Sequence, residues 1–338
     1  MKLGAYTACL HDKTLDEALE VVRELGLTAV ELNAGGFLPA PHLPVDALLA
    51  SSRARTEFLA RLDAAGVELT ALNVNGNPLH PDPEVGGKHA RDLRTAIELA
   101  GLLGVRHVIT MSGQPQAHPG GLTPAWTVEP WHSGATEVLD YQWNEVAVPF
   151  WKQIEEPARR ADVRVAIEMH PHNLVYNPVT LMRLIERVGS TQIGAEMDPS
   201  HLFWQGMEPL VAIEYLGDRV FHAAAKDVRI NEDHVKLHGV LDDRFRTPTR
   251  EEPGALGLIG LGGRYLLNEF PVDAPWQFVA VGRGHDTAYW TEFLAALRRI
   301  DPDMAVNIEH EDLELGQFEG LRVAADTLRA AVAELPAG

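Results

Sequence analysis

Short apolar runs and longer amphipathic segments alternate along this chain, and this alternation restricts its possible folds more than any other feature. The runs expected to form strands are residues 2–7, 28–33, 68–74, 106–111, 163–169, 193–198, 219–226 and 304–310. Apolar residues recur at helical spacing in segments such as 15–26, 55–66, 89–104, 145–161 and 288–300. Repeated strand–helix units of this kind most simply close into a single (β/α)₈ TIM barrel over residues 1–338. An open doubly wound sheet is the alternative.

Two segments are longer than the minimal repeat. Residues 112–136 follow the fourth expected strand and are rich in Pro, Gly and Trp, and residues 227–286 follow the seventh. Both come after the C-terminal end of a strand, and that face of a TIM barrel holds the active site. We therefore predict that both segments cover a substrate. Contact with another subunit is the alternative, because both segments are apolar and contain tryptophan.

Composition and charge exclude several classes of protein. Hydrophobic residues make up 46% of the 338 residues and charged residues 23%, which is typical of a globular chain. The net charge of -19 argues against a nucleic-acid partner, because binding to phosphates requires a basic surface. The sequence shows neither an export signal nor an apolar window long enough to cross a membrane. With Cys9 as the one cysteine, no internal disulfide can form, and we expect a cytoplasmic location.

Three carboxylates are expected at the ends of neighbouring strands. Glu168 ends a strand in "AIEMHPHN", Asp198 in "AEMDPSH" and Glu309 in "NIEHED". Together they would repel one another unless a cation lay between them. Carboxylate oxygens combined with an imidazole nitrogen are suitable ligands for Mn²⁺, Mg²⁺ or Co²⁺, and Zn²⁺ is also possible. Each residue also has a structural interpretation on its own. Glu168 could pair with a buried arginine, Asp198 could cap a helix, and His201 could be a hydrogen-bonded core histidine.

At this point the chain resembles a known family. The motifs "AIEMHPHN", "MDPSHLFWQG", "FHAAAKDVRI", "VGRGHD" and "IEHED" are similar to those of the xylose-isomerase-like barrel superfamily, the sugar phosphate isomerase/epimerase group. The resemblance implies one divalent metal ion, first of all Mn²⁺, held by Glu, Asp, His and Glu from strands five to eight. Glu168, Asp198 and Glu309 match three of these positions. It also implies that His201, which ends the Asp-x-x-His motif, faces the substrate or a second metal.

The fourth ligand departs from the family pattern. Many relatives have His-x-His-x-Lys-Asp on the seventh strand, and here the second histidine is replaced by Ala224. His222, our candidate for the ligand, lies about 6.6 Å deeper along the strand. His201 or a water molecule could fill the position instead, and the alanine run could also make room for a bulky substrate. Lys226 would then point at that space and bind substrate, or it could be a solvated lysine at a strand end.

Four further residues are candidates for the site. His170, two residues after Glu168, is placed near the expected metal and could act in acid–base catalysis. His132, in the segment "EPWHSG", could have the same role or lie on the surface, and Trp131 beside it could contact substrate. His285, in "VGRGHD", could bind substrate, whereas Asp286 is expected to cap the helix that follows.

These parts favour a sugar isomerase or epimerase that abstracts a proton next to a carbonyl through an enediolate. The alternative is a lyase on the same scaffold, similar to an inosose dehydratase or to the barrel subunit of C-glycoside deglycosidases. An apurinic endonuclease would need several zinc ions and a basic groove, and a non-catalytic sugar-binding protein would need no metal. The expected partners are a small sugar or glycoside, no nucleic acid and no membrane. We also expect a homo-oligomer or a complex with a small partner subunit.

Overall fold

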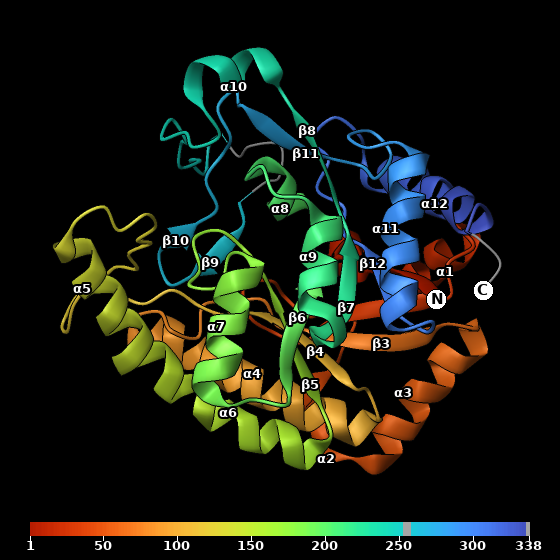
Figure 1. Ribbon diagram of the computed structural model, residues 1–338. Coiled ribbons are helices and arrows are strands. Elements are labelled where there is room, and N and C mark those ends of the chain that lie inside the picture. The colour runs from red at the N-terminus through yellow and green to blue at the C-terminus, as the bar shows by residue number, and fades with distance from the viewer. Residues whose placement is uncertain (253–257, 336–338) are drawn as a thin grey trace.

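The computed structural model describes residues 1–252 and 258–335. Parallel strands close into a barrel in the order β1-β12-β7-β6-β5-β4-β3-β2 (Figure 1). These strands are β1 (Lys2–Tyr6), β2 (Ala29–Asn33), β3 (Glu68–Asn73), β4 (His107–Met111), β5 (Arg164–Glu168), β6 (Ile193–Met197), β7 (Val220–Ala225) and β12 (Ala305–Ile308). Each lies within a run predicted from the sequence, so the prediction of a TIM barrel is confirmed and the open sheet is excluded.

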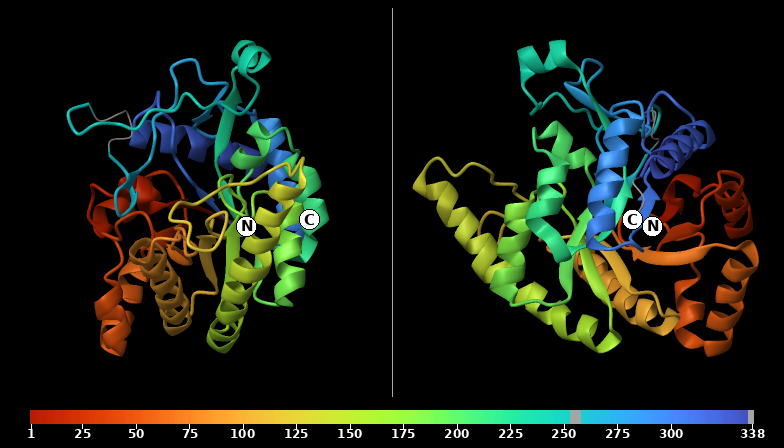
Figure 2. Two further views of the ribbon diagram at one scale, coloured as in Figure 1. Left: turned by 90° about the vertical axis from the view of Figure 1, so that its left-hand side faces the viewer. Right: turned by 45° about the vertical axis from the view of Figure 1, so that its right-hand side comes forward.

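Helices surround the barrel, as Figure 2 shows from two further sides. They are α1 (Leu15–Glu24), α2 (Val45–Ala50), α3 (Ser52–Ala65), α4 (Pro83–Leu103), α6 (Val148–Ala161), α7 (Pro178–Val188), α8 (Ser200–Trp204), α9 (Pro209–Leu216), α11 (Thr287–Ile300) and α12 (Gln317–Ala333). Short 3₁₀ turns at Thr7–Leu10 and Gly217–Arg219 complete the connections. Gly66, Gly104 and Gly189 end α3, α4 and α7 at positive φ, a conformation that glycine adopts without strain. Asp286 caps α11 as predicted, since its side chain accepts the N–H of Tyr289.

The long segment after β4 is shorter than predicted. Helix α5 (Ser133–Tyr141) begins inside the predicted segment 112–136 and continues through a π-helical turn (Gln142–Ala147) into α6. His132 provides the cap that starts α5, because its Nδ1 accepts the N–H of Ala135 at 3.3 Å. The sequence reasoning treated "WHSGA" as loop and missed this cap.

The insertion after β7 rises from the barrel and returns beside its starting point. It contains β8 (Asp227–Ile230), α10 (Glu232–His238), β9 (Gly260–Gly262), β10 (Tyr265–Leu266) and β11 (Trp276–Val279). Strands β8 and β11 form an antiparallel pair in which Asp227 lies opposite Val279 and Ile230 opposite Trp276. In Figure 1 this pair and α10 stand above the C-terminal ends of the barrel strands. The insertion is therefore positioned to cover that face.

Strand β7 places its alanines on both sides of the barrel wall. Ala223 and Ala225 belong to the main hydrophobic core, with Trp151, Trp290 and Phe293 among its large buried side chains. Because side chains alternate along a strand, Ala224 shares the inner side of the barrel with His222. The small side chains therefore allow close packing outside the barrel and leave room inside it. Within residues 1–252 and 258–335, the structure has no helix with the length and hydrophobicity that a membrane crossing requires.

Candidate metal centre

Strands β5, β6 and β12 bring three carboxylates together at the mouth of the barrel. Glu168 is the last residue of β5, Asp198 follows β6 directly and Glu309 follows β12 directly. One carboxylate oxygen from each residue lies within 4.8 Å of the others. Glu168 and Asp198 are each 1% exposed, and the Glu309 side chain is 15% exposed. The three acids predicted from the sequence therefore form one buried group of oxygen donors, which we call the acid trio.

Two neighbouring side chains hold Glu168 in place. Asn75 Nδ2 donates to Glu168 Oε2 at 2.6 Å, and His201 Nε2 lies 3.1 Å from Glu168 Oε1. Burial alone would raise the pKa of Glu168, but the hydrogen bond with His201, the nearby imidazole of His170 and the ammonium group of Lys226 outweigh it and lower the pKa to about 2. Glu168 is therefore an ionised carboxylate. Among the described residues no arginine pairs with it, so that alternative does not hold.

Asp198 and His201 each have a buried polar atom without a hydrogen-bond partner. Asp198 Oδ1 accepts the N–H of Ser200 at 2.8 Å, close to the capping contact considered from the sequence, but Oδ2 accepts no hydrogen bond. His201 Nε2 lies 3.4 Å from that oxygen, and His201 Nδ1 has no hydrogen-bond partner. Burial lowers the pKa of His201 to about 3, so its ring is neutral and can ligate a cation. The donors around Glu168 thus fit a divalent metal ion.

Lys226 is buried beside the acid trio. Its Nζ lies 2.9 Å from Glu309 Oε1 and 2.7 Å from Glu311 Oε1, and its side chain is 3% exposed. The interpretation as a solvated lysine is therefore wrong. Lys226 is also a cationic partner of Glu309 that the sequence motifs do not reveal. Lys226 provides a fixed positive charge at the edge of the acid trio.

His222 lies in a second, deeper cluster and not with the acid trio. Its Nδ1 is 3.3 Å from Glu196 Oε1, and its Nε2 is 3.6 Å from Glu31 Oε2. His222 therefore does not extend through the space above Ala224. The possibility that His222 is the fourth ligand of the acid trio is wrong. His201 is the histidine that the structure places against both Glu168 and Asp198.

The other candidate histidines differ in their positions. The ring of His170 packs on that of His201 with centroids 4.0 Å apart, and one donor atom each from His170, His201 and Glu168 lie within 4.8 Å of one another. His285 Nδ1 is bound to Asp227 Oδ1 at 2.7 Å, and its ring stacks on Phe203. His170 is therefore part of the centre. His285 has a structural contact that the sequence analysis did not assign.

Trp131 and His132 lie away from the acid trio. Trp131 is 91% exposed, and the ring of His132 is used to cap α5. Figure 1 shows α5 at the outer edge of the molecule, far from β7 and β12. The structure therefore does not bring these two residues to the centre, and their roles in catalysis and substrate binding stay predictions.

The insertion contributes an aromatic side chain above the centre. Lys226 Nζ lies 4.4 Å from the ring centroid of Phe278 on β11, and the ring of His201 meets that of Phe278 edge-on at 5.6 Å. Trp126, from the segment after β4, packs on His172 at 4.7 Å. Each of the two long segments thus supplies an aromatic residue next to the end of a barrel strand.

Sequence reasoning missed Asn75 and Phe278. Asn75 follows the third strand in "NVNGN", and a polar run directly after a strand is a signal that could have identified it. Phe278 lies in the alternating run "WQFV", which indicates a strand but not the residues that this strand would face. Both contacts join segments that are distant in the sequence.

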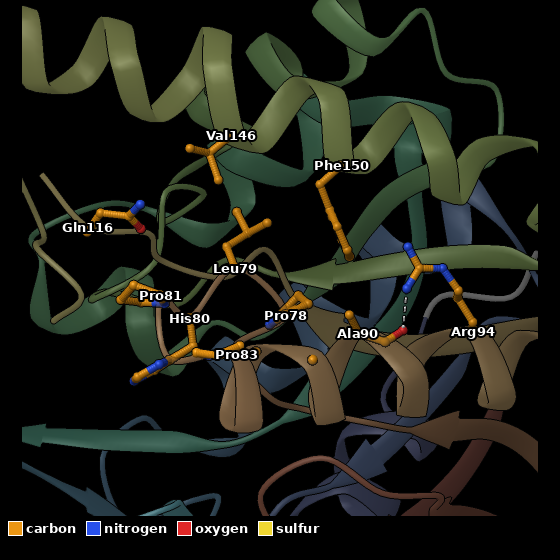
Figure 3. A pocket seen from close by; sticks show the side chains of 12 residues that line it. Pro78, Leu79, His80, Pro81, Pro83, Ala90, Arg94, Gln116, Val146 and Phe150 are labelled. Carbon is orange, nitrogen blue, oxygen red and sulfur yellow. Dashed lines mark hydrogen bonds between the residues drawn. The ribbon is translucent and has the colours of Figure 1, made fainter. Parts of the chain in front are cut away.

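The structure also contains a cavity of about 480 Å³. Figure 3 shows it between the loop after β3, the first turns of α4, and α6. The side chains of Pro78, His80, Arg94 and Phe150 line it, and no member of the acid trio does. The cavity is therefore separate from the candidate metal centre.

Comparison with known proteins assigns the chain to a family. The family model described as xylose isomerase-like TIM barrel matches residues 19–331. The "uncharacterized protein YfiH" of Bacillus subtilis (strain 168) is 36% identical over 338 residues, which cover 99% of this chain and 100% of that protein.

Several solved structures share the fold. The probable 3-DHS dehydratase AsbF from Bacillus anthracis aligns with a TM-score of 0.61 at 14% identity, over 97% of this chain and 99% of that one. An L-ribulose 3-epimerase aligns with a TM-score of 0.60 at 16% identity, over 98% of this chain and 96% of that one. The IOLI protein with a binding zinc atom aligns with a TM-score of 0.62 at 16% identity, over 100% of both chains. Because these identities are low, the likenesses establish the fold alone.

Proposed function

This chain belongs to the xylose isomerase-like TIM barrel family, and we propose that it is a divalent-metal-dependent sugar isomerase or epimerase. The reaction proposed is removal of a proton from a carbon next to a carbonyl. The observation that supports it most is the acid trio of Glu168, Asp198 and Glu309, with one oxygen of each within 4.8 Å.

Glu168, Asp198, Glu309 and His201 would hold the cation. The unpaired Oδ2 of Asp198 and the neutral ring of His201 support this assignment. Mn²⁺ is our first choice, and Mg²⁺, Co²⁺ and Zn²⁺ have compatible ligand preferences. When bound, the ion would act as a Lewis acid that stabilises negative charge developing on a sugar oxygen.

The residues of the chain would position and deprotonate the substrate. Asn75 and His201 fix the carboxylate of Glu168, so that it can take a proton from a carbon held above it. Lys226 holds Glu309, whose carboxylate could return a proton to the other face of that carbon. A base on each face would permit epimerisation, and the ring of Phe278 would limit the access of water.

A lyase is the second candidate. The same proton abstraction starts an elimination when the next carbon bears a leaving group. The aromatic residues of the two long segments, Trp126 and Phe278, favour a substrate with an apolar group, such as the aglycone of a glycoside. AsbF, one of the structures with this fold, is described as a probable dehydratase.

Two rival classes have less support. An apurinic endonuclease would bind DNA, and the net charge of -19 opposes that. A non-catalytic sugar-binding protein would not need buried carboxylates that repel one another. We retain a cytoplasmic location and a homo-oligomer or small partner subunit as proposals.

Exchange of hydrogen with heavy water tests the function. The Mn²⁺-loaded protein is incubated with ketoses, inososes and 3-oxo-glycosides in D₂O, and each sugar is examined by NMR. We expect deuterium at one carbon next to a carbonyl of one of these classes. Glu168→Gln and Glu309→Gln should lose most of this exchange while retaining the fold.

Glu137→Gln is the matched control, since Glu137 is exposed on α5, and it should exchange as the wild type does. Metal content must be measured for each variant. Turnover of a sugar without any solvent deuterium in the product would contradict proton abstraction and indicate direct hydride transfer.

A further inference from the structure

The barrel interior contains a second group of potential metal ligands, separate from the acid trio. It consists of Glu31 on β2, Glu196 on β6 and His222 on β7, and one donor atom of each lies within 4.8 Å of the others. None of the three residues is more than 2% exposed. Residues from three different strands thus converge in the closed core, and we call them the inner cluster.

The hydrogen bonds of the inner cluster give its two buried carboxyl groups no lysine or arginine partner among the described residues. His222 faces Glu196 through Nδ1 at 3.3 Å and Glu31 through Nε2 at 3.6 Å, but a neutral imidazole has one N–H and can donate to one carboxylate only. In residues 1–252 and 258–335 neither glutamate forms an ion pair with a lysine or arginine. Asn73 Nδ2 donates to Glu31 Oε1 at 2.8 Å, which is a hydrogen bond from a neutral group. Buried carboxylates without a cation are costly.

The side chain of Asn307, on β12, gives an independent indication of a ligand. Its Nδ2 lies 3.0 Å from His222 Nε2, 3.1 Å from Thr70 Oγ1 and 3.2 Å from Glu31 Oε2. Two amide hydrogens can serve three acceptors only if one of them is shared in a weaker bifurcated bond. The Oδ1 atom of the same amide is buried without any hydrogen-bond partner. A half-turn of the amide would direct this unpaired oxygen at the inner cluster.

We propose that Glu31, Glu196, His222 and Asn307 bind a second divalent cation inside the barrel. Two carboxylates, an imidazole and an amide oxygen suit Mn²⁺ or Zn²⁺. The cation supplies the positive charge that the two glutamates lack, and Asn307 gains a partner for its oxygen. Ala224 lies beside Asn307 in the β7–β12 register, and its small side chain leaves room in this layer. Ala224, the one alanine of the run on the inner side of the barrel, therefore serves the inner site.

Metal counting tests this site independently of the proposed reaction. The protein is unfolded in chelator, refolded with MnCl₂ or ZnCl₂, desalted and analysed for metal by mass spectrometry. We expect Glu196→Gln and Glu31→Gln each to contain one cation per chain fewer than the wild type. Tyr6→Phe is the matched control in the same core, because the Tyr6 hydroxyl bonds Asn33 and no member of the inner cluster. It should lose no cation.

Asp198→Asn separates the two sites. It should remove the cation of the acid trio and leave the cation of the inner cluster. The metal count of the inner cluster can therefore be tested even if the protein lacks the proposed activity. If both Glu196→Gln and Glu31→Gln retain the metal content of the wild type, the inner site does not exist.

Thermal stability provides a readout that does not depend on desalting. In metal-free protein Glu196→Gln replaces a buried carboxyl group with an uncharged amide of the same shape and should leave Tm unchanged or raise it. With Mn²⁺ or Zn²⁺ the wild type and Tyr6→Phe should show a larger rise in Tm than Glu196→Gln or Glu31→Gln. An equal metal-induced rise in all four proteins would overturn the proposal.

Discussion

Replacing Lys226 with methionine should destabilise the metal-free protein and strengthen metal binding. The ammonium group lies 2.9 Å from Glu309 and 2.7 Å from Glu311, and its side chain is 3% exposed. Removing one partner of a buried ion pair costs about 3 to 5 kcal/mol, because the remaining charge is left unpaired. Glu311 is 34% exposed and is partly screened by water, so we expect a loss near the lower end of that range.

The metal-loaded protein should respond differently. In Lys226→Met, a cation bound by Glu309 would neutralise the charge of that carboxylate in place of the ammonium group. The cation would also no longer be repelled by the ammonium group. Unit charges about 4 Å apart interact by about 4 kcal/mol at an effective dielectric constant of 20. Even a fraction of this energy should tighten Mn²⁺ binding by about 10-fold or more. The free energy of unfolding should therefore fall less in Lys226→Met when Mn²⁺ is present.

Urea unfolding with and without Mn²⁺ measures both effects. Lys2→Met is the matched control. Lys2 forms an ion pair with Glu68, but the two side chains are 37% and 55% exposed, so the pair should contribute less than about 1 kcal/mol to the free energy of unfolding. If Lys226→Met loses the same unfolding free energy with and without Mn²⁺, then Glu309 does not bind the cation and the reasoning is refuted.

Three further predictions concern the space on β7, the insertion and the metal. Ala224→His should raise Mn²⁺ affinity if the fourth position of the acid trio is open to it, as titration calorimetry would show, and unchanged affinity would contradict this. Asp227 accepts the N–H groups of Val228, Gly282, Gly284 and His285, so Asp227→Ala should cost about 3 kcal/mol or more and speed limited proteolysis within 227–286. Proteolysis at the wild-type rate would argue against that anchor. Exhaustive chelation should lower Tm and abolish activity, and Mn²⁺, Co²⁺ or Mg²⁺ should restore both; activity insensitive to chelation would refute a metal-dependent reaction.

The barrel could be predicted from the sequence because its signals are local. Each strand is a short apolar run, and turns such as those at Gly66 and Gly104 end the helices where the pattern indicates. The trio of Glu168, Asp198 and Glu309 followed from the same reasoning, since the ends of parallel strands meet at one face.

The contacts between distant segments could not be predicted. The pairing of Lys226 with Glu309 and Glu311 joins the residue after β7 to residues after β12, and the spacing within either motif does not reveal it. His222 was one of three possibilities for the fourth ligand, although it was expected to lie deeper along the strand than the family's ligand position. In the structure it faces Glu196 instead, because the two residues lie side by side in the β6–β7 register. That register depends on the closure of the whole barrel.

The location of bound manganese tests the central claim most directly. Crystals of the protein soaked in MnCl₂ are measured at a wavelength where manganese scatters anomalously, so that the ion can be distinguished from water. We predict an anomalous peak within coordination distance of Glu168, Asp198 and Glu309, about 2.0 to 2.3 Å from the nearest oxygens. Well-defined density for these three side chains without an anomalous peak between them would contradict the account.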